Sequence, residues 1–434
     1  MKNKMFMRMF RHKLFRPVLL ILVLLSVFTV LWTRTEDYFP IPPSLEDNVA
    51  FWEKIYTEVS VTEGLLHDRE YPLVVYKKIK VGNRIRQKKK IVSMLKRISG
   101  VSESEWSGEE KRIYEQFLKH APKTALKEAA KRIRFQAGQK ERFRDGLVRS
   151  GMYLDEIRDI LKEYDVPARL AYLPHVESSF NIEARSKVGA AGMWQFMKGT
   201  GKQYLKVGSL IDERHDPTLS TVAAAKLLSR NYESLGSWPL AVTAYNHGLY
   251  GMKRAVASTG SEDIGTIIEK HKSRTFRFAS KNFYSCFLAA SEVAENHKKY
   301  FKKVKLKPPF RRNMIRLEHP LPSDMICDSL DMPSETFRRY NPALRSALYK
   351  NNGFVPKGQT ICFTSSVSSA SARKALASAY SEWKKSRPAV YKVKKGDYLD
   401  LIARKMGVSA TEIARANGLS NKNRIYPGQV LKIP

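Results

Sequence analysis

The chain has 434 residues, of which 43% are hydrophobic and 27% charged, so it has room for about two to four domains and can bury a core over most of its length. Its 77 lysine and arginine residues outnumber its 42 acidic residues, which gives a net charge of +35 and a surface that attracts polyanions such as nucleic acid, anionic lipid or cell-wall polymer. The three cysteines, Cys286, Cys327 and Cys362, show no C-x-x-C spacing, which excludes a zinc ribbon, a thioredoxin-like motif and a disulfide-dense scaffold.

Residues 1–43 have the features of an export signal. Six basic and no acidic residues precede an apolar run from Pro17 to Trp32, and a proline-rich exit follows at 40–43. As a helix, the 16 residues of the run would span about 24 Å, slightly less than the roughly 30 Å core of a bilayer. Because no A-x-A-like cleavage site and no lipid-accepting cysteine follow, we favour an uncleaved anchor with the remainder exported, and secretion after cleavage is the alternative.

Residues 44–149 are strongly charged and predicted to be mostly helical, with helices at 109–118 and 126–135. The run 77–90 carries eight basic residues and no acidic one, which is typical of a solvated or lipid-facing surface. No motif in this region indicates a chemistry, so its role is left unassigned.

Residues 150–308 are predicted to form an all-helical globular domain. One helix is expected from Ser150 to a point before Pro167, because apolar residues recur there on one face. Another is expected to begin with Asp216 as its cap and Pro217 as its first residue, and to end at Gly236.

The last third of the chain contains a repeat. Residues 326–341 match residues 402–417 at a spacing of 76, and in both copies a turn containing Pro and Gly-Gln leads into a short apolar strand. Each copy is predicted as strand, helix, helix, strand. We place the copies at 309–364 and 389–434, joined by a Ser- and Ala-rich linker at 365–388 that is partly helical at most.

The C-terminal copy resembles a LysM module, a small fold that binds carbohydrate chains containing N-acetylglucosamine. A strand and Gly-Asp turn at 391–397, then Asn417, then Pro-Gly-Gln at 427–429 occur in the order of the family. Tyr398 departs from the family, which usually has a small hydroxyl residue there. The copy at 309–364 lacks the Gly-Asp turn and is LysM-like, so we do not expect strong sugar binding from it.

Three blocks in the helical domain suggest a sugar site: 173–180, with Glu177 among aliphatic and aromatic residues, 186–196, rich in small residues, and 244–248, Ala-Tyr-Asn-His-Gly. Apolar surroundings raise the pKa of a carboxyl group. Amides can hydrogen-bond N-acetyl groups, Met and Trp can wall a sugar face, and glycine lets the backbone approach a polymer closely. A lone glutamate is usually a surface residue, so the hypothesis rests on the combination of blocks.

These blocks, at these intervals, resemble the catalytic domain of lytic transglycosylases of glycoside hydrolase family 23. The Glu-Ser pair of the family matches Glu177 and Ser178, its Gly-Leu-Met-Gln block appears as Gly-Met-Trp-Gln at 192–195, and its Ala-Tyr-Asn-x-Gly block is intact. The resemblance implies a mainly α protein, with a lysozyme-like all-helical catalytic domain followed by small α+β (βααβ) modules. It implies Glu177 as the catalytic residue. The substrate-binding residues that it implies are Ser178, Ser186, Met193, Gln195, Tyr245, Asn246 and Tyr284.

The fourth block of the family, around Glu-Thr-x-x-Tyr-Val, falls on 279–284. This places Phe283 at the position of the family tyrosine, with Tyr284 one residue later. Either Tyr284 takes over the role of that hydroxyl or the site works without it.

The resemblance implies cleavage of the MurNAc-GlcNAc β-1,4 bond of peptidoglycan without water. Protonated Glu177 would donate to the glycosidic oxygen and then, once ionised, accept the proton of the muramoyl C6 hydroxyl, which attacks C1 and closes a 1,6-anhydro ring. The acid has to be neutral near pH 7, so the hypothesis requires apolar surroundings for Glu177. Glu183 and Asp212 are the nearest further carboxyl groups along the chain, and we interpret both as structural or solvated.

We expect no cofactor and no metal, because His175 and His247 lack the spacing of a metal-binding pair. The expected partners are peptidoglycan glycan strands, also bound by the LysM module, and a membrane contacted by the N-terminal segment. We expect no nucleic acid, since no recognition motif accompanies the positive charge. The expected location is the cell envelope, with an inner-membrane anchor and the catalytic part in the periplasm.

Two other functions stay open at this point. A hydrolytic muramidase would use Glu177 as the acid and Glu183 or Asp212 as its partner. A non-catalytic scaffold would keep the same blocks only to bind peptidoglycan. The sequence does not distinguish endo- from exo-acting cleavage and indicates no protein partner.

Overall fold

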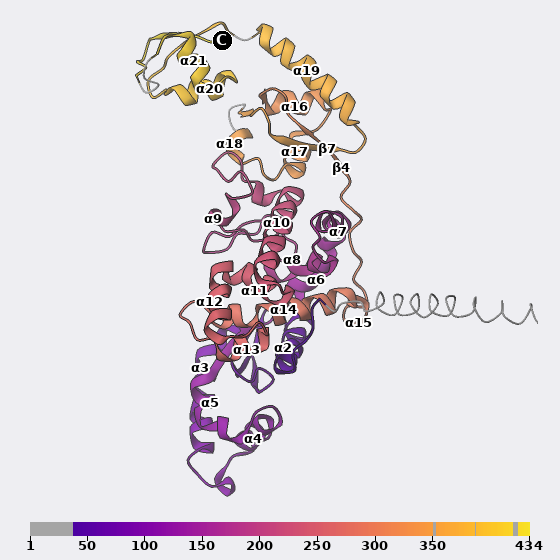
Figure 1. Cartoon of the computed structure of the whole chain (residues 1–434), viewed down its shortest axis with the longest axis vertical. Helices are drawn as coiled ribbons and strands as arrows, with labels where there is room; N and C mark the ends of the chain where they lie inside the picture. Colours follow the sequence, from indigo (N-terminus) through magenta and orange to yellow (C-terminus); the bar gives the residue numbers. More distant parts are fainter. Residues whose placement is uncertain (1–37, 350–352, 387, 420–423) are drawn as a thin grey trace, which may run out of the picture.

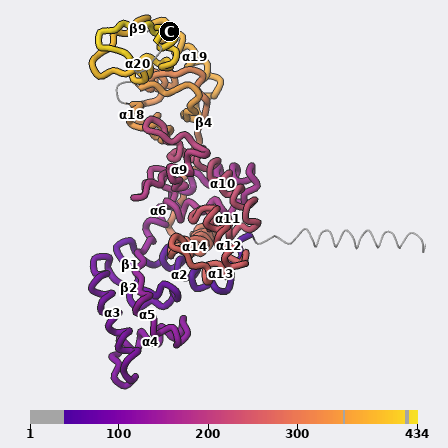
Figure 2. Tube along the Cα trace, turned by 60° about the vertical axis from the view of Figure 1, so that its left-hand side comes forward, coloured from indigo at the N-terminus to yellow at the C-terminus, as the bar shows by residue number. Residues whose placement is uncertain are grey.

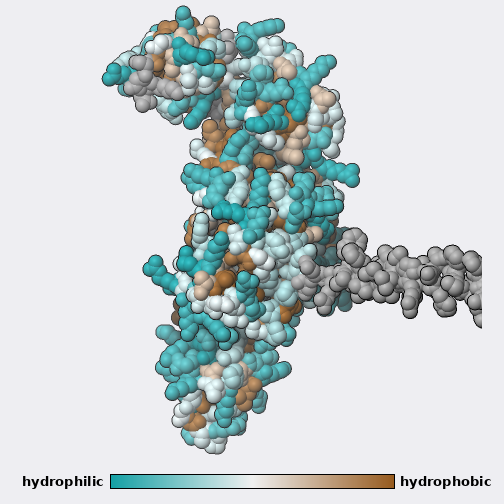
Figure 3. Space-filling view, viewed as in Figure 1, coloured by the Kyte–Doolittle hydropathy of each residue, from teal (hydrophilic) through white to brown (hydrophobic). Residues whose placement is uncertain are grey.

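The computed structural model describes residues 38–349, 353–386, 388–419 and 424–434. The molecule is elongated, and its parts follow one another along the long axis roughly in chain order (Figures 1 and 2). Hydrophilic side chains cover most of the face seen in Figure 3. The predicted membrane segment, Pro17 to Trp32, lies outside the described residues. Within the described ranges, every helix is too short or too polar to cross a bilayer.

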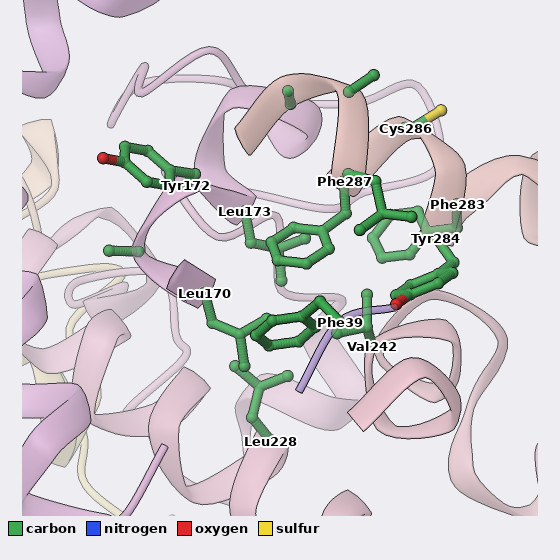
Figure 4. Packing of buried hydrophobic residues seen from close by; sticks show 14 of the residues in the cluster. Phe39, Leu170, Tyr172, Leu173, Leu228, Val242, Phe283, Tyr284, Cys286 and Phe287 are labelled. Carbon is green, nitrogen blue, oxygen red and sulfur yellow. The ribbon is translucent and has the colours of Figure 1, made fainter. Parts of the chain in front are cut away.

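The central body comprises residues 38–57 and 140–301 and is helical. Buried apolar side chains from most of its helices form one continuous core. In this core α14 packs against α2, α8 and α11, and Figure 4 shows Phe39, Phe283, Tyr284 and Phe287 packed there. Its helices are α2 (Glu46–Thr57), α6 (Lys140–Ser150), α7 (Leu154–Glu163), α8 (Leu173–Glu177), α9 (Lys198–Gly201), α10 (Pro217–Leu235), α11 (Trp238–His247), α12 (Leu249–Thr259), α13 (Ile264–Lys270), α14 (Phe278–Glu295) and α15 (His297–Tyr300).

Local signals set the ends of α10 as predicted. The carboxylate of Asp216 accepts a hydrogen bond from the backbone N–H of Leu219 at 2.9 Å, and Gly236 ends the helix with a left-handed φ of 68°. The predicted start of the helix before Pro167 is wrong by one element. Ser150 is the last residue of α6, and α7 begins at Leu154, because a turn at 151–153 separates the two helices.

The N-terminal lobe, residues 63–137, combines a sheet with helices. Its strands β1 (Glu63–Asp68), β2 (Val75–Lys80) and β3 (Ile133–Ala137) form an antiparallel sheet in the order β2-β1-β3. Its helices are α3 (Arg84–Ile98), α4 (Gly108–His120) and α5 (Leu126–Arg132).

The helix predicted at 109–118 lies within α4 and is confirmed. The helix predicted at 126–135 is wrong from residue 133 onward, because Ile133 to Phe135 pair with β1 as part of a strand. The predicted domain boundary between 149 and 150 stays a prediction. Helix α2, on its N-terminal side, belongs to the same core as the helices that follow.

The C-terminal copy has the predicted order of strand, helix, helix, strand, and the first copy has the same order with the short elements β5, α18 and β6 added. The mainly α fold with small βααβ modules is confirmed. Strand β4 pairs antiparallel with β7, and β8 with β9. The first module contains β4 (Arg312–Arg316), β5 (Leu321–Pro322), α16 (Ser323–Ser329), α17 (Ser334–Tyr340), α18 (Ser346–Tyr349), β6 (Phe354–Val355) and β7 (Thr360–Thr364). The C-terminal module contains β8 (Val390–Lys392), α20 (Leu399–Met406), α21 (Ala410–Ala416) and β9 (Val430–Lys432).

An asparagine at the equivalent position makes the same hydrogen bonds in both modules. In the first, the Asn341 amide donates to the carbonyl oxygen of Cys362 and its oxygen accepts from the Cys362 N–H. In the second, Asn417 makes the same pair of bonds to Lys432. Each asparagine thus ties the second helix of its module to the last strand. Cys362 and Cys327 are buried free thiols.

The segment between the modules is more ordered than predicted. Instead of a linker that is partly helical at most, residues 369–386 form one continuous helix, α19 (Ser369–Ser386). Alanine favours helix strongly, and Ala372 and Leu376 are buried in the core of the first module. Packing on one face therefore stabilises a helix that composition alone did not indicate.

Candidate active site

Glu177 is the last residue of the short helix α8, and its side chain is partly exposed while Leu173 and His175 of the same helix are buried. Across the described residues, no hydrogen bond or ion pair engages its carboxyl group. Burial raises the pKa of Glu177 to about 8, and no charged group in the described part of the chain offsets this effect. A carboxyl group with this pKa is protonated near neutral pH and available as a proton donor.

Side chains from three other helices surround this carboxyl group. Burial and, to a smaller extent, the charge of Glu177 raise the pKa of Tyr245 on α11. Burial also raises the pKa of Tyr56 on α2. Cys286 adds to this increase, and Glu177 makes a smaller contribution. The Tyr56 hydroxyl hydrogen-bonds to the thiol of Cys286 on α14, whose pKa burial also raises. All three groups are therefore neutral and add no counter-charge that would favour ionised Glu177.

His175 lies two residues before Glu177 and contributes aromatic packing. Its ring stacks on Phe143 at 4.6 Å between centroids and meets Phe180 edge to face, also at 4.6 Å. Burial lowers the pKa of His175 to about 3, so the imidazole is neutral. A cation at this position would have lowered the pKa of Glu177, and the neutral ring does not.

Ser178 connects the first block to the second. Its hydroxyl donates to the carbonyl oxygen of Met193 at 2.7 Å and accepts from the N–H of Asn181. The next two residues, Ser179 and Phe180, have left-handed φ values of 53° and 58°, which are costly for residues other than glycine. The chain is thus strained immediately after Glu177 and Ser178.

The second block is a tight loop stabilised by hydrogen bonds between its own residues. At Gly192, φ is 80° and an added Cβ atom would lie 1.7 Å from the carbonyl oxygen of Arg214, so only glycine fits. The Gln195 side chain donates to the carbonyl oxygen of Gly192 at 2.8 Å, and the Ser186 hydroxyl accepts from the N–H of Ala190 at 2.9 Å. Gln195 is partly exposed.

The third block joins the second through Tyr245. Its hydroxyl donates to the carbonyl oxygen of Trp194 at 2.8 Å. The adjacent Asn246 is exposed, and its side-chain oxygen accepts from the hydroxyl of Ser280 at 3.0 Å. With the bond from Ser178 to Met193, the structure brings all three sequence blocks together around Glu177.

Two predicted binding residues have buried side chains. Met193 and Tyr284 are both 0% exposed. The Tyr284 hydroxyl donates to the carbonyl oxygen of Pro40 at 2.9 Å, and the ring lies beside Phe39 in Figure 4. Their predicted roles toward substrate stay predictions, but neither side chain presents a surface to a sugar, because each faces the core. Phe283 is also in that core.

Sequence reasoning missed Tyr56. It lies in α2, far along the chain from the three blocks, and only packing brings it to Glu177. Its ring stacks on Phe143 at 4.9 Å, which in turn stacks on His175. The sole signal in the sequence was the apolar face of residues 46–57, which indicates a helix docked on a core but names no partner.

The two further carboxyl groups are engaged elsewhere or solvated, as interpreted from the sequence. The side chain of Glu183 is 63% exposed. Asp212 is buried and accepts from both the Nε and the Nη2 of Arg214 at 2.8 Å. Burial by itself would raise the pKa of Asp212, but the hydrogen bonds and the charge of Arg214 outweigh it and hold the pKa below its ordinary value.

Two family models match parts of the chain. A family model described as "Transglycosylase SLT domain" matches residues 157–268, and one described as "LysM domain" matches residues 391–434. The chain therefore carries an SLT domain, which contains all three blocks, and a C-terminal LysM domain.

The chain is similar to membrane-bound lytic murein transglycosylase D of Escherichia coli strain K12, with 27% identity over 296 residues, 67% of this chain and 65% of that protein. It spans just under two thirds of that relative's length. It also matches N-acetylmuramoyl-L-alanine amidase sle1 of Staphylococcus epidermidis, with 40% identity over 84 residues, 19% of this chain and 24% of that protein. The solved structure of the soluble lytic transglycosylase Slt70 of Escherichia coli matches with a TM-score of 0.29 and 20% identity, covering 33% of this chain and 24% of that chain.

Proposed function

We propose that this protein is a peptidoglycan lytic transglycosylase that cleaves the MurNAc-GlcNAc β-1,4 bond without water and leaves 1,6-anhydro-MurNAc ends. Glu177 is the single general acid and base. The observation that carries the proposal is the unpaired carboxyl group of Glu177, whose pKa burial raises to about 8, at the point where the three blocks of the SLT domain meet.

The proposed reaction follows from that protonation state. Neutral Glu177 gives its proton to the glycosidic oxygen as the bond to C1 breaks. The carboxylate left behind accepts the proton of the muramoyl C6 hydroxyl, whose oxygen forms the new bond to C1. The acid is thereby restored, and no water enters. The low polarity around Glu177 favours the return of the proton, because the ionised form is poorly solvated there.

A hydrolytic muramidase requires a second carboxyl group that acts on C1 or on water. Asp212 is committed to Arg214, and Glu183 points toward solvent. Among the described residues, no carboxyl group contributes to the pKa of Glu177, whereas a second carboxylate at catalytic distance would raise it. This supports the transglycosylase over the muramidase.

The remaining blocks are proposed to hold the substrate and the site. The partly exposed Gln195 and Tyr245 and the exposed Asn246 bind the sugar and its N-acetyl group. Ser178 and Ser186 position the loop that carries Gln195 through their hydrogen bonds to its backbone. Buried Met193 and Tyr284 support the site from the core and do not contact sugar.

The C-terminal LysM domain is proposed to bind the same glycan strands and to raise the local concentration of substrate at the catalytic domain. The net charge of +35 favours an anionic envelope. We propose a periplasmic catalytic part with an inner-membrane anchor at residues 1–43, because the similar protein of Escherichia coli is a membrane-bound lytic murein transglycosylase.

Replacement of Glu177 tests the proposal. Glu177→Gln keeps the size and polarity of the side chain but removes the transferable proton, so lysis of purified sacculi, followed by turbidity, should fall at least about a thousandfold. Binding to sacculi in a pelleting assay should stay within twofold.

Glu183→Gln is the matched control, because it makes the same chemical change in an exposed side chain. It should lyse sacculi at the wild-type rate. A Glu177→Gln variant that still lyses would remove Glu177 from the mechanism. Failure of the wild-type protein to lyse, with binding intact, would favour the non-catalytic scaffold.

A further inference from the structure

A cleft is lined by residues outside the three blocks around Glu177. It is a cleft of about 930 Å³ at the junction of the N-terminal lobe and the central body. Helices α2 and α13 lie at the end of the body nearest that lobe in Figure 1. One wall comes from the start of α2, the other from α13 and the first turns of α14, and the lobe adds the turn after β1 and one residue of β3. A cleft of this size accommodates a ligand of several residues.

Basic residues outnumber acidic residues in the lining of the cleft. Two acidic residues, Glu70 and Glu269, also line it. Glu70 already pairs with Arg69 and with Arg132, so it leaves most of the positive charge uncompensated. The basic residues that line the cleft are Arg69, Arg134, Lys272, Arg277 and Lys281.

Arg134 is the most distinctive of these groups. Its guanidinium lies 3.7 Å from the centroid of the Phe278 ring, which fixes its plane. In the described parts of the chain it makes no ion pair and no hydrogen bond to a carboxylate, so its N–H groups are available to a planar oxyanion. Burial lowers the pKa of Arg134. Burial also lowers the pKa of Lys281, although the charge of Glu70 acts in the opposite direction.

The cleft is mechanically connected to the proposed catalytic site. Ser280, between cleft residues Phe278 and Lys281 on α14, donates to Asn246 of the third block. Asn282, also in the cleft, accepts from the side chains of Asn48 and Trp52 on α2. The first turns of α14 therefore line the cleft with Phe278, Lys281 and Asn282 and contact the third block through Ser280.

We propose that this cleft binds the carboxylates of the short acidic peptides that branch from the glycan strand, and so selects glycan that carries peptides. This inference rests on the proposed function. Guanidinium forks bind carboxylates in a bidentate manner, and the lysines can take a second carboxylate farther along the peptide. Apolar surface from Phe278 and Ile268 offers contact for the small aliphatic parts of such a peptide.

The test uses the full chain with the double variant Arg134→Gln, Lys281→Gln. The matched control is Lys88→Gln, Lys89→Gln, which removes the same charge from exposed positions on α3 outside the cleft. Cleavage is measured on sacculi with intact peptides and on sacculi from which an amidase has removed the peptides. Binding of the released peptides to each protein is measured by calorimetry.

The cleft variant should lose about tenfold in kcat/KM on peptide-bearing glycan and stay within twofold of wild type on bare glycan. Its affinity for the released peptide should fall about tenfold, and the control variant should match wild type throughout. Equal losses on both glycans, or no loss on either, would overturn the proposal.

Two further outcomes are distinguishable. Phosphatidylglycerol vesicles are tested in parallel, and a selective loss of vesicle binding with unchanged peptide binding would assign the cleft to phosphate headgroups and reject the peptide. If wild-type protein cleaves neither glycan, the proposed function fails, whereas the peptide titration still decides whether the cleft binds acidic peptides.

Discussion

Two acidic side chains of the central body have opposite electrostatic settings. Asp212 is 4% exposed and accepts two hydrogen bonds of 2.8 Å from the Arg214 guanidinium, which hold its pKa below the ordinary value despite burial. Glu177 has no such partner in the part of the chain that the structure describes, and burial raises its pKa to about 8. Burial therefore does not decide the charge of a carboxyl group by itself. In these two cases, the presence or absence of an arginine partner determines whether the buried carboxyl group is ionised.

The pairing also assigns different tasks to the two groups. Arg214 donates to the carbonyl oxygens of Gly189 and Phe196 as well as to Asp212. Ionised Asp212 thus fixes the arginine that holds both ends of the loop at 189–196, which carries Gln195. One carboxyl group maintains the shape of the site, and the other is left free for proton transfer.

The largest difference between variants of Asp212 and Glu177 is expected in the free energy of unfolding. Asp212→Asn should lower the free energy of unfolding by about 3–5 kcal/mol, because it leaves the buried Arg214 without its counter-charge. Glu177→Gln should leave it unchanged or raise it by roughly 1–2 kcal/mol, because it removes a group whose ionised form is poorly solvated. Urea unfolding at neutral pH measures both.

Effects of the same sign and size in the two variants would contradict the distinction between the paired and the unpaired carboxyl group. Loss of lysis by Asp212→Asn in protein that remains folded would give Asp212 a part in the chemistry and favour the muramidase.

A smaller difference between Glu177 and Asp212 is expected in how each makes stability depend on pH. The pKa of Glu177 is raised from 4.5 to about 8 on folding, so the folded protein holds a proton that the unfolded chain releases between these values. Stability should therefore fall as pH rises from 4.5 to about 8, and Glu177→Gln should remove that slope. Lysis by wild type should fall about tenfold per pH unit above pH 8, as the acid ionises.

Titration of Asp212 contributes with the opposite sign. Its pKa is lower in the folded protein, so its stabilising effect is present above the pKa of the unfolded chain and is lost as pH falls through the folded value.

Lysis that stays constant from pH 7 to pH 10 would show that Glu177 is not the proton donor.

The sequence predicted what lies in contiguous segments. Glu177, Gln195 and Tyr245 sit in short blocks whose composition indicated their chemistry, and the structure joins those blocks by hydrogen bonds from Ser178 and Tyr245. The caps of α10 and the order of elements in both modules were predictable for the same reason, because local residues determine them.

Contacts between distant segments were not predictable. Tyr56 reaches Glu177 only because α2 packs against α14, and Ile133 joins a strand because β1 offers it a pairing edge. Likewise, the hydrogen bond from the Tyr284 hydroxyl to the carbonyl oxygen of Pro40 joins two segments that are far apart in the chain. The docking of α19 depends on the core of the first module, which the composition of residues 365–388 does not reveal.

The proposed mechanism requires that Glu177 alone transfers protons while the C6 hydroxyl attacks C1. This requirement is tested by digesting purified sacculi in water enriched in oxygen-18 and analysing the fragments by mass spectrometry. If the C6 hydroxyl attacks C1 and Glu177 alone transfers protons, every new muramoyl end will be a 1,6-anhydro ring, one water lighter than a reducing end and free of the label. New reducing ends that carry oxygen-18 would show that water attacks C1, and would contradict the proposed mechanism.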